Sequence, residues 1–169
     1  MGLKKPDYLP IGDDYPPQPV SAYGLSNGWP RKMCFYFTQR TGIATICLRP
    51  PAVWLPEYYE RVRAWRAEEP EREWQRAWEY GAFCDVRDVA AAAVLGLTCP
   101  NPGHVTLLLC ADDINSDHPS RDLAQRVHPD VPWVGGSEYE QNPFRALVSN
   151  QRAKAVLGWQ PQYRWRRTA

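Results

Sequence analysis

The sequence lacks the short glycine motifs that bind nucleotide phosphates. Its eleven glycines never fall into the pattern G-x-G-x-x-G or G-x-x-x-x-G-K-[ST], and the Gly135-Gly136 pair has no third glycine at the required offset. These patterns let a tight turn bring backbone amides against a pyrophosphate or triphosphate. The chain therefore has no turn of this kind with which to hold a dinucleotide.

Excess charge and long apolar runs are also absent. Twenty basic residues face nineteen acidic ones, giving a net charge of +1, and no block of one sign would follow a phosphate backbone. No apolar run approaches the roughly 20 residues of a membrane span, and the polar start has no signal-peptide core. We expect no nucleic-acid partner, no membrane and a cytoplasmic protein.

Cysteines are few and odd in number. The five lie at positions 34, 47, 84, 99 and 110, mostly among apolar neighbours. Widely spaced cysteines without a paired histidine in the sequence are typical of reduced thiols that fill a core. We therefore expect neither disulfides nor a catalytic cysteine.

A metal site is not expected either. Asp113, Asn115 and Asp117 match alternate ligands of a calcium loop, but His118 replaces its glycine and Ala124 its bidentate glutamate. Capping of the helix that follows explains the same polar residues.

What the sequence does contain predicts one α/β domain over residues 1–169. Hydrophobic residues make up 44% of the chain, with eight tryptophans, enough to fill a core. Ile43–Leu48 and His104–Cys110 are short apolar runs typical of parallel strands. Two such strands rarely form a stable sheet alone, so we expect an incomplete parallel sheet with an open edge.

Proline and helical periodicity divide the rest of the chain. Residues 1–22 contain five prolines and are predicted to be an extended lead-in. The first helix is predicted from after Ala22 to about Arg40, weakened at its start by Gly28 and Pro30, with Gly42 as C-cap. Further helices are predicted over Glu57–Pro70, Glu71–Tyr80, Val89–Leu97 with Asp88 at its start, Pro119–Val127 behind Asp117, and Asn150–Leu157 closed by Gly158. Residues 131–149 are predicted to be loop. The two charged helices between Glu57 and Tyr80 could form either a solvated helical hairpin or a lid over a substrate.

Four segments carry a family resemblance. They are Pro19-Val20-Ser21-Ala22-Tyr23-Gly24-Leu25-Ser26-Asn27, Gly42-Ile43-Ala44-Thr45-Ile46-Cys47-Leu48-Arg49-Pro50, Asp85-Val86-Arg87-Asp88-Val89-Ala90 and Leu157-Gly158-Trp159-Gln160-Pro161. In this order and at about this spacing they resemble the second half of the extended short-chain dehydrogenase/reductase family, which includes NAD-dependent epimerases and dehydratases. The resemblance implies an incomplete Rossmann-like sheet with a helical substrate-binding region.

The resemblance assigns the catalytic tyrosine to Tyr23. Four residues later, where the family has lysine, this chain has Asn27, which would lie beside the phenol on one face of a helix. A positive charge about 4 Å away lowers a phenol pKa by roughly three units at an effective dielectric of 20, and asparagine supplies almost none of this. Lys32, nine residues beyond Tyr23, would lie on the opposite side of a helix.

Cofactor and substrate residues follow from the resemblance as well. It places cofactor contacts at Pro50 and Pro51 and substrate contacts at Trp54 and Arg87, with NAD or NADP as the cofactor. Trp54-Leu55-Pro56 replaces the family's usual Tyr-Gly-Pro turn. Arg87 could hold a substrate phosphate or form an ion pair with Asp88.

Two functions remain open. In the first, the chain is a truncated or split section of an epimerase, dehydratase or reductase acting on a sugar nucleotide, inactive alone and completed by a separate N-terminal half. In the second, it is a non-catalytic remnant that serves as an interaction module, pairing its sheet edge with a partner or with a second copy.

Overall fold

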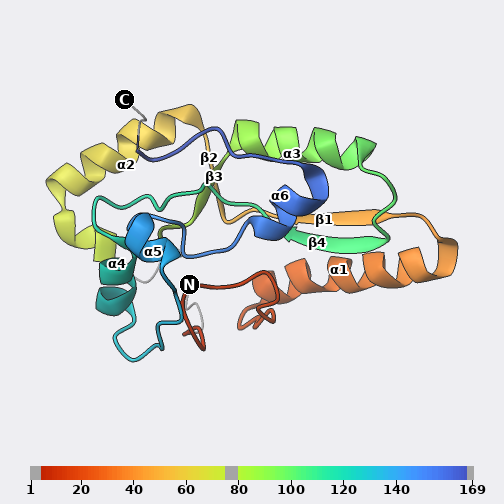
Figure 1. The fold of residues 1–169 in the computed structure, drawn as a ribbon, viewed down its shortest axis with the longest axis horizontal. Coiled ribbons are helices and arrows are strands. Elements are labelled where there is room, and N and C mark those ends of the chain that lie inside the picture. Colours follow the sequence, from red (N-terminus) through yellow and green to blue (C-terminus); the bar gives the residue numbers. More distant parts are fainter. Residues whose placement is uncertain (1–4, 75–79, 167–169) are drawn as a thin grey trace.

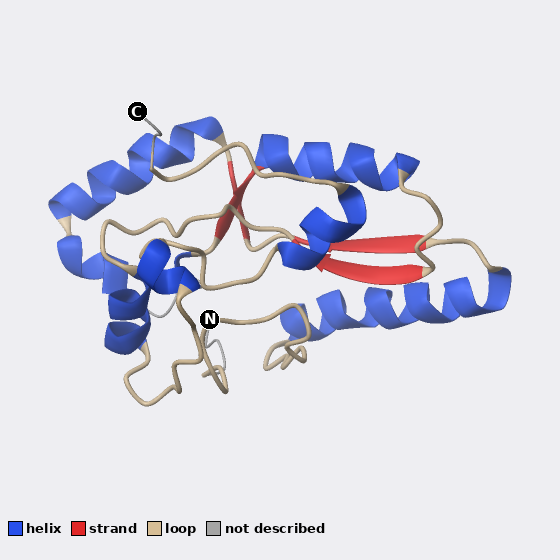
Figure 2. Ribbon diagram, viewed as in Figure 1, coloured by secondary structure: helices blue, strands red, loops and turns tan. Residues whose placement is uncertain are grey.

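A computed structural model describes residues 5–74 and 80–166 of the chain. Its longest strands are β1, Thr45–Arg49, and β4, His104–Leu108, which pair in parallel with Ile46 opposite Val105 (Figure 1). Each is a short run of apolar and β-branched residues flanked by proline or glycine, the pattern of a buried parallel strand. The prediction of an α/β fold with an incomplete parallel sheet is confirmed (Figure 2).

Helix α1, Ala22–Thr41, packs against both strands. The Ser21 hydroxyl caps it by accepting a hydrogen bond from the backbone N–H of Gly24, and Gly42 ends it with a left-handed φ of 72°, as predicted. The helix covers the stretch predicted after Ala22 and runs through Pro30 without a break. Tyr23 and Asn27 therefore lie within its first two turns.

A second two-stranded sheet was missed by the sequence analysis. β2, Ala52–Trp54, pairs in parallel with β3, Phe83–Asp85, and neither segment was predicted to be a strand. A run of three residues is too short to show strand periodicity, so β2 and β3 form because of tertiary packing.

Helix α2, Pro56–Glu68, follows β2 and begins with proline in its first turn. A 3-10 turn, η1, covers Pro70–Trp74 and packs against α2. The rest of the predicted helix Glu71–Tyr80 lies largely outside the described residues.

Helix α3, Val86–Thr98, begins earlier than predicted. Its N-cap is Asp85, which accepts a hydrogen bond from the backbone N–H of Arg87, so Asp88 lies inside the first turn rather than before it. α1 and α3 both contact β1, and Figure 1 draws them on opposite sides of it. Leu107 and Ala92 are fully buried in the core that α3, the sheet and α6 share.

The remaining helices are short. α4 spans Ser120–Val127, α5 Glu138–Gln141 and α6 Gln151–Leu157. The N-cap of α4 is Pro119, with no side-chain cap, so the predicted capping by Asp117 is wrong. α5 interrupts the segment 131–149 that we predicted to be loop. Gly158 ends α6 with a φ of 66°, as predicted.

The proline-rich lead-in packs against the later part of the chain. Leu9 is almost fully buried, and its backbone N–H donates to the carbonyl of Pro132. The N–H of Ile11 donates to the carbonyl of Leu147, and that of Ser149 donates back to Ile11. These backbone bonds hold an otherwise irregular segment in place.

Residues 159–166 run back over the core and contact elements far away in sequence. Trp159 and Trp165 are buried, and the backbone N–H groups of Trp165 and Arg166 donate to the Asp113 carboxylate. Trp165 packs with Trp54 and Phe83 in a separate apolar cluster, next to α2. This segment thereby joins α2 to the sheets.

Candidate functional site

A cleft lies between the first half of α1 and the carboxyl end of β1. Its volume is about 720 Å³. Tyr23 and Asn27 line it from the helix, while Pro50 and Pro51 line it from the connection that follows β1. The residues predicted as catalytic and those predicted as cofactor-binding therefore share one cavity. The crevice at the carboxyl ends of parallel strands is also where open α/β sheets commonly bind ligands.

Tyr23 and Asn27 lie one turn apart on the cleft side of α1. The Tyr23 side chain is 69% exposed, so its phenol is accessible to a molecule entering the cleft. Asn27 is exposed and neutral, and its backbone carbonyl accepts a hydrogen bond of 3.4 Å from Nε of Arg31. The geometry supplies the tyrosine but no positive charge at position 27.

Two arginines in the cleft were missed by the sequence analysis. Arg31 follows Tyr23 by eight residues, close to two full helical turns, and so lies on the same face of α1. Arg49 enters from the end of β1. Burial lowers the pKa of Arg49 below its ordinary value, and the positive charge of Arg31 lowers it further. The i, i+4, i+8 spacing of Tyr23, Asn27 and Arg31 was the signal available in the sequence.

Trp54 lies away from this cleft. It is 3% exposed and its ring packs at centroid distances of 4.6 Å from Phe83 and 5.4 Å from Tyr59. Its neighbour Val53 lines the cleft instead. In this conformation the Trp54 ring is part of the apolar core next to α2.

Arg87 also lies elsewhere, and the ion pair expected with Asp88 is wrong. Its Nε and Nη2 donate to the two carboxylate oxygens of Asp85, each at 2.8 Å, and its guanidinium stacks 3.4 Å from the ring centre of Tyr163. The Asp88 carboxylate instead accepts the backbone N–H groups of Gln162 and Tyr163. The helix begins at Val86, which places Asp85 rather than Asp88 at the cap.

The Asp85 carboxylate is fully buried yet charged. Burial alone would raise its pKa, but hydrogen bonds from the side chain and backbone of Arg87 and from the Tyr59 hydroxyl bring the pKa below its ordinary value. Burial of the Tyr59 hydroxyl and its hydrogen bond to Asp85 raise the pKa of Tyr59. Asp85, Arg87 and Tyr59 are thus paired with one another within the protein. This favours a structural ion pair over a substrate contact for Arg87.

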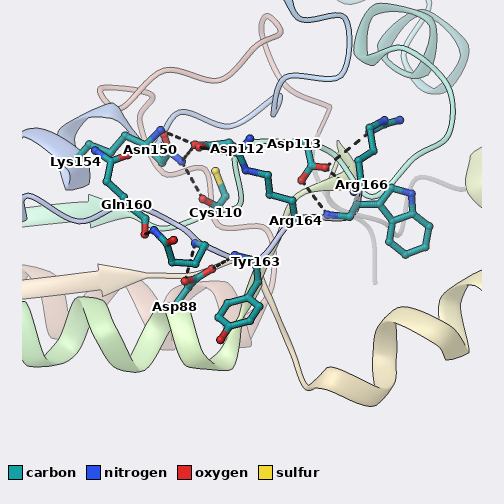
Figure 3. Close-up of polar contacts among 12 residues, drawn as sticks. Asp88, Cys110, Asp112, Asp113, Asn150, Lys154, Gln160, Tyr163, Arg164 and Arg166 are labelled. Carbon is teal, nitrogen blue, oxygen red and sulfur yellow. Dashed lines mark hydrogen bonds and ion pairs between the residues drawn. The ribbon is translucent and has the colours of Figure 1, made fainter. Parts of the chain in front are cut away.

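A second polar cluster surrounds Asp112, beyond the carboxyl end of β4 (Figure 3). Its Oδ1 accepts hydrogen bonds from Nδ2 of Asn150 at 2.9 Å and from Nζ of Lys154 at 2.5 Å, while its Oδ2 pairs with Arg164 at 3.3 Å. These residues line a cavity of about 380 Å³. One carboxylate thus binds both cations, Lys154 and Arg164. The cluster ties α6 and residues 159–166 to the carboxyl end of β4.

The polar residues of the calcium-like run are used by the protein itself. Asp113 accepts two backbone N–H groups, Asn115 accepts a hydrogen bond from Arg66 at 2.7 Å, and Asp117 accepts one from Nε1 of Trp165 at 2.9 Å. Among the residues that the structure describes, no group of three or more His, Cys, Asp or Glu side chains could hold a metal ion.

All five cysteines are free thiols, and Cys84 and Cys110 are buried. Burial raises the pKa of the Cys84 thiol to about 12. Burial and the neighbouring Cys34 raise that of Cys47 to about 11. Such thiols are poor nucleophiles at neutral pH.

No described helix is long and apolar enough to cross a membrane. No protein-family model and no curated protein matches the sequence.

Solved structures do match the chain. A UDP-galactose 4-epimerase aligns with a TM-score of 0.54 and 16% identity over 93% of this chain and 54% of its own. A UDP-glucuronic acid 4-epimerase from Bacillus cereus in complex with NAD aligns with a TM-score of 0.56 and 16% identity over 97% of this chain and 54% of its own. A short-chain dehydrogenase/reductase superfamily protein from Agrobacterium tumefaciens with bound NAD aligns with a TM-score of 0.57 and 20% identity over 95% of this chain and 59% of its own.

This chain has the fold of one part of these proteins. It spans a little over half the length of each of the three structures. The likeness confirms, at the level of the fold, the resemblance carried by the sequence motifs.

Proposed function

We propose that the chain is the tyrosine-bearing section of an NAD(P)-dependent epimerase, dehydratase or reductase for a sugar nucleotide, which works in the cytoplasm and only with a section that binds the dinucleotide. The cleft that joins Tyr23 and Asn27 to Pro50 and Pro51 carries the proposal. The fold shared with solved epimerases, one of them with NAD bound, supports it.

Tyr23 has the central role in this proposal. Its exposed hydroxyl would give a proton to, or take one from, a substrate hydroxyl placed in the cleft. NAD or NADP, when bound, would accept or return a hydride. Pro50 and Pro51 would form the wall against which the nicotinamide end lies. The proposal gives Trp54 and Arg87 no direct contact in this cleft, because the Trp54 ring is buried and Arg87 is paired with Asp85.

Asn27 limits what the chain can do alone. An amide carries no charge, so position 27 lacks the cation with which the family's lysine would assist proton transfer by the Tyr23 hydroxyl. The sequence also has no glycine turn for the pyrophosphate. We therefore expect neither tight cofactor binding nor turnover from the isolated chain.

The test compares the chain alone with the chain mixed with a second polypeptide that carries the glycine fingerprint. Fluorescence titration with NADH and NADPH measures cofactor binding, and a hydride-transfer assay over several sugar nucleotides measures activity. We expect saturable cofactor binding only in the mixture. Asn27→Lys should raise the rate of the mixture at neutral pH, and Tyr23→Phe should abolish it.

Two results would contradict this proposal. Saturable micromolar binding of NADH by the unmodified chain alone would show that the missing glycine turn is not needed. A stable mixture in which Asn27→Lys shows no turnover on any substrate would show that the cleft is not catalytic.

The open edges of the β1–β4 sheet favour the second candidate, a non-catalytic interaction module. Within the described residues β1 pairs with β4 alone, and α1 exposes Leu25, Trp29, Met33 and Tyr36. Unpaired strand edges and exposed apolar side chains are typical of surfaces that bind a partner. Light scattering tests this: a dimer or a complex supports the module, and a sharply monomeric elution with a cooperative melt contradicts it.

A further inference from the structure

We propose that the cleft beside Tyr23 is an anion site in which Arg31 and Arg49 bind the phosphate of a small phosphate monoester. The site goes beyond the proposed function, because it needs neither a dinucleotide nor a second polypeptide.

The charge in the cleft is unbalanced. Arg31 and Arg49 both line it, and none of the residues that line it is an aspartate or a glutamate. Over residues 5–74 and 80–166, neither arginine forms a salt bridge. Two other half-buried arginines do have an acidic partner: Arg63 pairs with Glu60, and Arg166 pairs with Asp113. Two like charges held together without a counter-charge favour the binding of an anion.

The two arginines come from rigid elements that face one another. Arg31 lies on α1, one turn beyond Asn27 and two beyond Tyr23, and its Nε is held by the carbonyl of Asn27. Arg49 is the last residue of β1, whose backbone carbonyl is fixed by the N–H of Leu109. Figure 1 shows the start of α1 on the same side as the carboxyl end of β1. Helix α1 and strand β1 thereby fix the backbones of both arginines, and only their side chains need to order when an anion binds.

Phosphate fits this pair better than a carboxylate does. A phosphate monoester carries about −1.5 to −2 charges at pH 7 and offers three acceptor oxygens, so it can neutralise two guanidinium groups at once. A carboxylate has one charge and two oxygens. Arginine's planar fork also binds phosphate through two parallel hydrogen bonds.

The size of the cleft calls for an organic group on the phosphate. A volume of about 720 Å³ is far larger than a phosphate ion requires. Beside the arginines, its wall is formed by Leu48, Val53 and five prolines, with the exposed ring of Tyr23 at one side. We therefore expect an apolar or aromatic group on the ester to strengthen binding.

The test titrates the purified chain with inorganic phosphate and with phenyl phosphate by isothermal calorimetry at low salt. We expect a dissociation constant on the order of a millimolar for inorganic phosphate, and tighter binding for phenyl phosphate. Arg31→Gln and Arg49→Gln should each weaken binding by about ten-fold or more, because each removes a charge-assisted hydrogen bond. Asn27→Lys should tighten binding, since it adds a positive charge on the same face of α1.

Lys32→Gln is the matched control. Lys32 has the same charge and lies next to Arg31 on the same helix, but it does not line the cleft; it lines a neighbouring cavity that Arg31 also reaches. Its substitution should change affinity less than two-fold. Arg31 is on a partly exposed helix face, so Arg31→Gln remains a valid test even if Arg49→Gln fails to fold.

Three outcomes would overturn the proposal. Equal weakening by Lys32→Gln and Arg31→Gln would show diffuse attraction to a basic helix. Benzoate binding as tightly as phenyl phosphate would show that the phosphate is not recognised. Absence of heat and of any ³¹P line broadening up to tens of millimolar phosphate would show that no site exists. None of these depends on the dinucleotide assays, so this proposal and the proposed function can fail separately.

Discussion

The hydroxyl of Tyr59, on α2, donates a hydrogen bond of 3.0 Å to Oδ2 of Asp85, the residue that caps α3. Asp85 is fully buried, and Arg87 covers both of its oxygens. One carboxylate therefore connects the helix that follows β2 with the helix that follows β3. This arrangement ties α2 to the core, as expected of part of a fixed layer rather than of a freely moving lid.

Tyr59→Phe should lower the free energy of unfolding by about 1–2 kcal/mol, because it removes a hydrogen bond to a buried charged group. Urea unfolding at pH 7 measures this. Tyr58→Phe is the control, since the Tyr58 hydroxyl has no hydrogen bond to the part of the chain that the structure describes. Equal effects of the two substitutions would show that the Asp85 bond contributes nothing.

The effect of Tyr59→Phe should depend on pH. The pKa of Asp85 is lowered in the folded protein, so its contribution is present above the unfolded-state value near 3.8 and is lost as pH falls through the folded value. The difference between wild type and Tyr59→Phe should therefore be constant from pH 7 to about pH 5 and shrink below pH 4. A difference that grows on acidification would contradict this assignment.

Gly158→Ala should cost about 1–2 kcal/mol of stability. Gly158 has a φ of 66°, where a Cβ is disfavoured, and no atom within 4 Å would meet that Cβ. The cost is thus a backbone effect alone. Gly12→Ala is the control: that position also has open space but no positive φ, and the melting temperature of this variant should match that of wild type. Equal melting temperatures for both variants would refute the left-handed cap.

Trp165→Phe should loosen α2. The substitution removes the hydrogen bond from Nε1 to Asp117 and part of the ring surface that Arg63 and Arg66 cover at 4.3 and 4.9 Å. Stability should fall by about 1–3 kcal/mol. Hydrogen exchange should rise mainly in α2, whereas Trp29→Phe, at a 63% exposed site, should leave exchange in α2 unchanged. Faster exchange spread evenly over the chain would contradict a local role.

Cys47 should react slowly with iodoacetamide. Its pKa of about 11, raised first by burial and then by Cys34, leaves on the order of one thiolate in a thousand at pH 8. Alkylation followed by peptide mapping should show a rate that rises about ten-fold per pH unit between pH 8 and pH 10. The urea-unfolded chain is the control and should react far faster at pH 8. Folded and unfolded rates that agree would show that Cys47 is not shielded.

The strands that could be predicted from the sequence are those whose own residues decide them. β1 and β4 are continuous runs of β-branched and apolar residues, and Gly42 and Gly158 mark the helix ends that need a left-handed residue. β2 and β3 could not be predicted, because three residues show no periodicity and the pairing of the two strands depends on packing.

The candidate site was predictable only in part. Helical spacing correctly placed Tyr23 and Asn27 together, and the motif after β1 placed Pro50 and Pro51 near them. The same helical spacing would also have placed Arg31 near Tyr23 and Asn27, but it was used only to place Lys32 on the opposite side of the helix. Arg49 was beyond sequence reasoning, since only the packing of α1 on β1 brings it to the helix. The partner of Arg87 was assigned wrongly because it depends on which residue caps α3.

The contacts of segment 159–166 also bear on the order in which the chain folds. Its backbone is fixed by two carboxylates far away in sequence: Asp88 accepts from residues 74 and 75 positions later, and Asp113 from residues 52 and 53 positions later. Closing loops of this length is entropically slow, so contacts of this kind form late. We therefore expect substitutions in this segment to speed unfolding while leaving the folding rate almost unchanged.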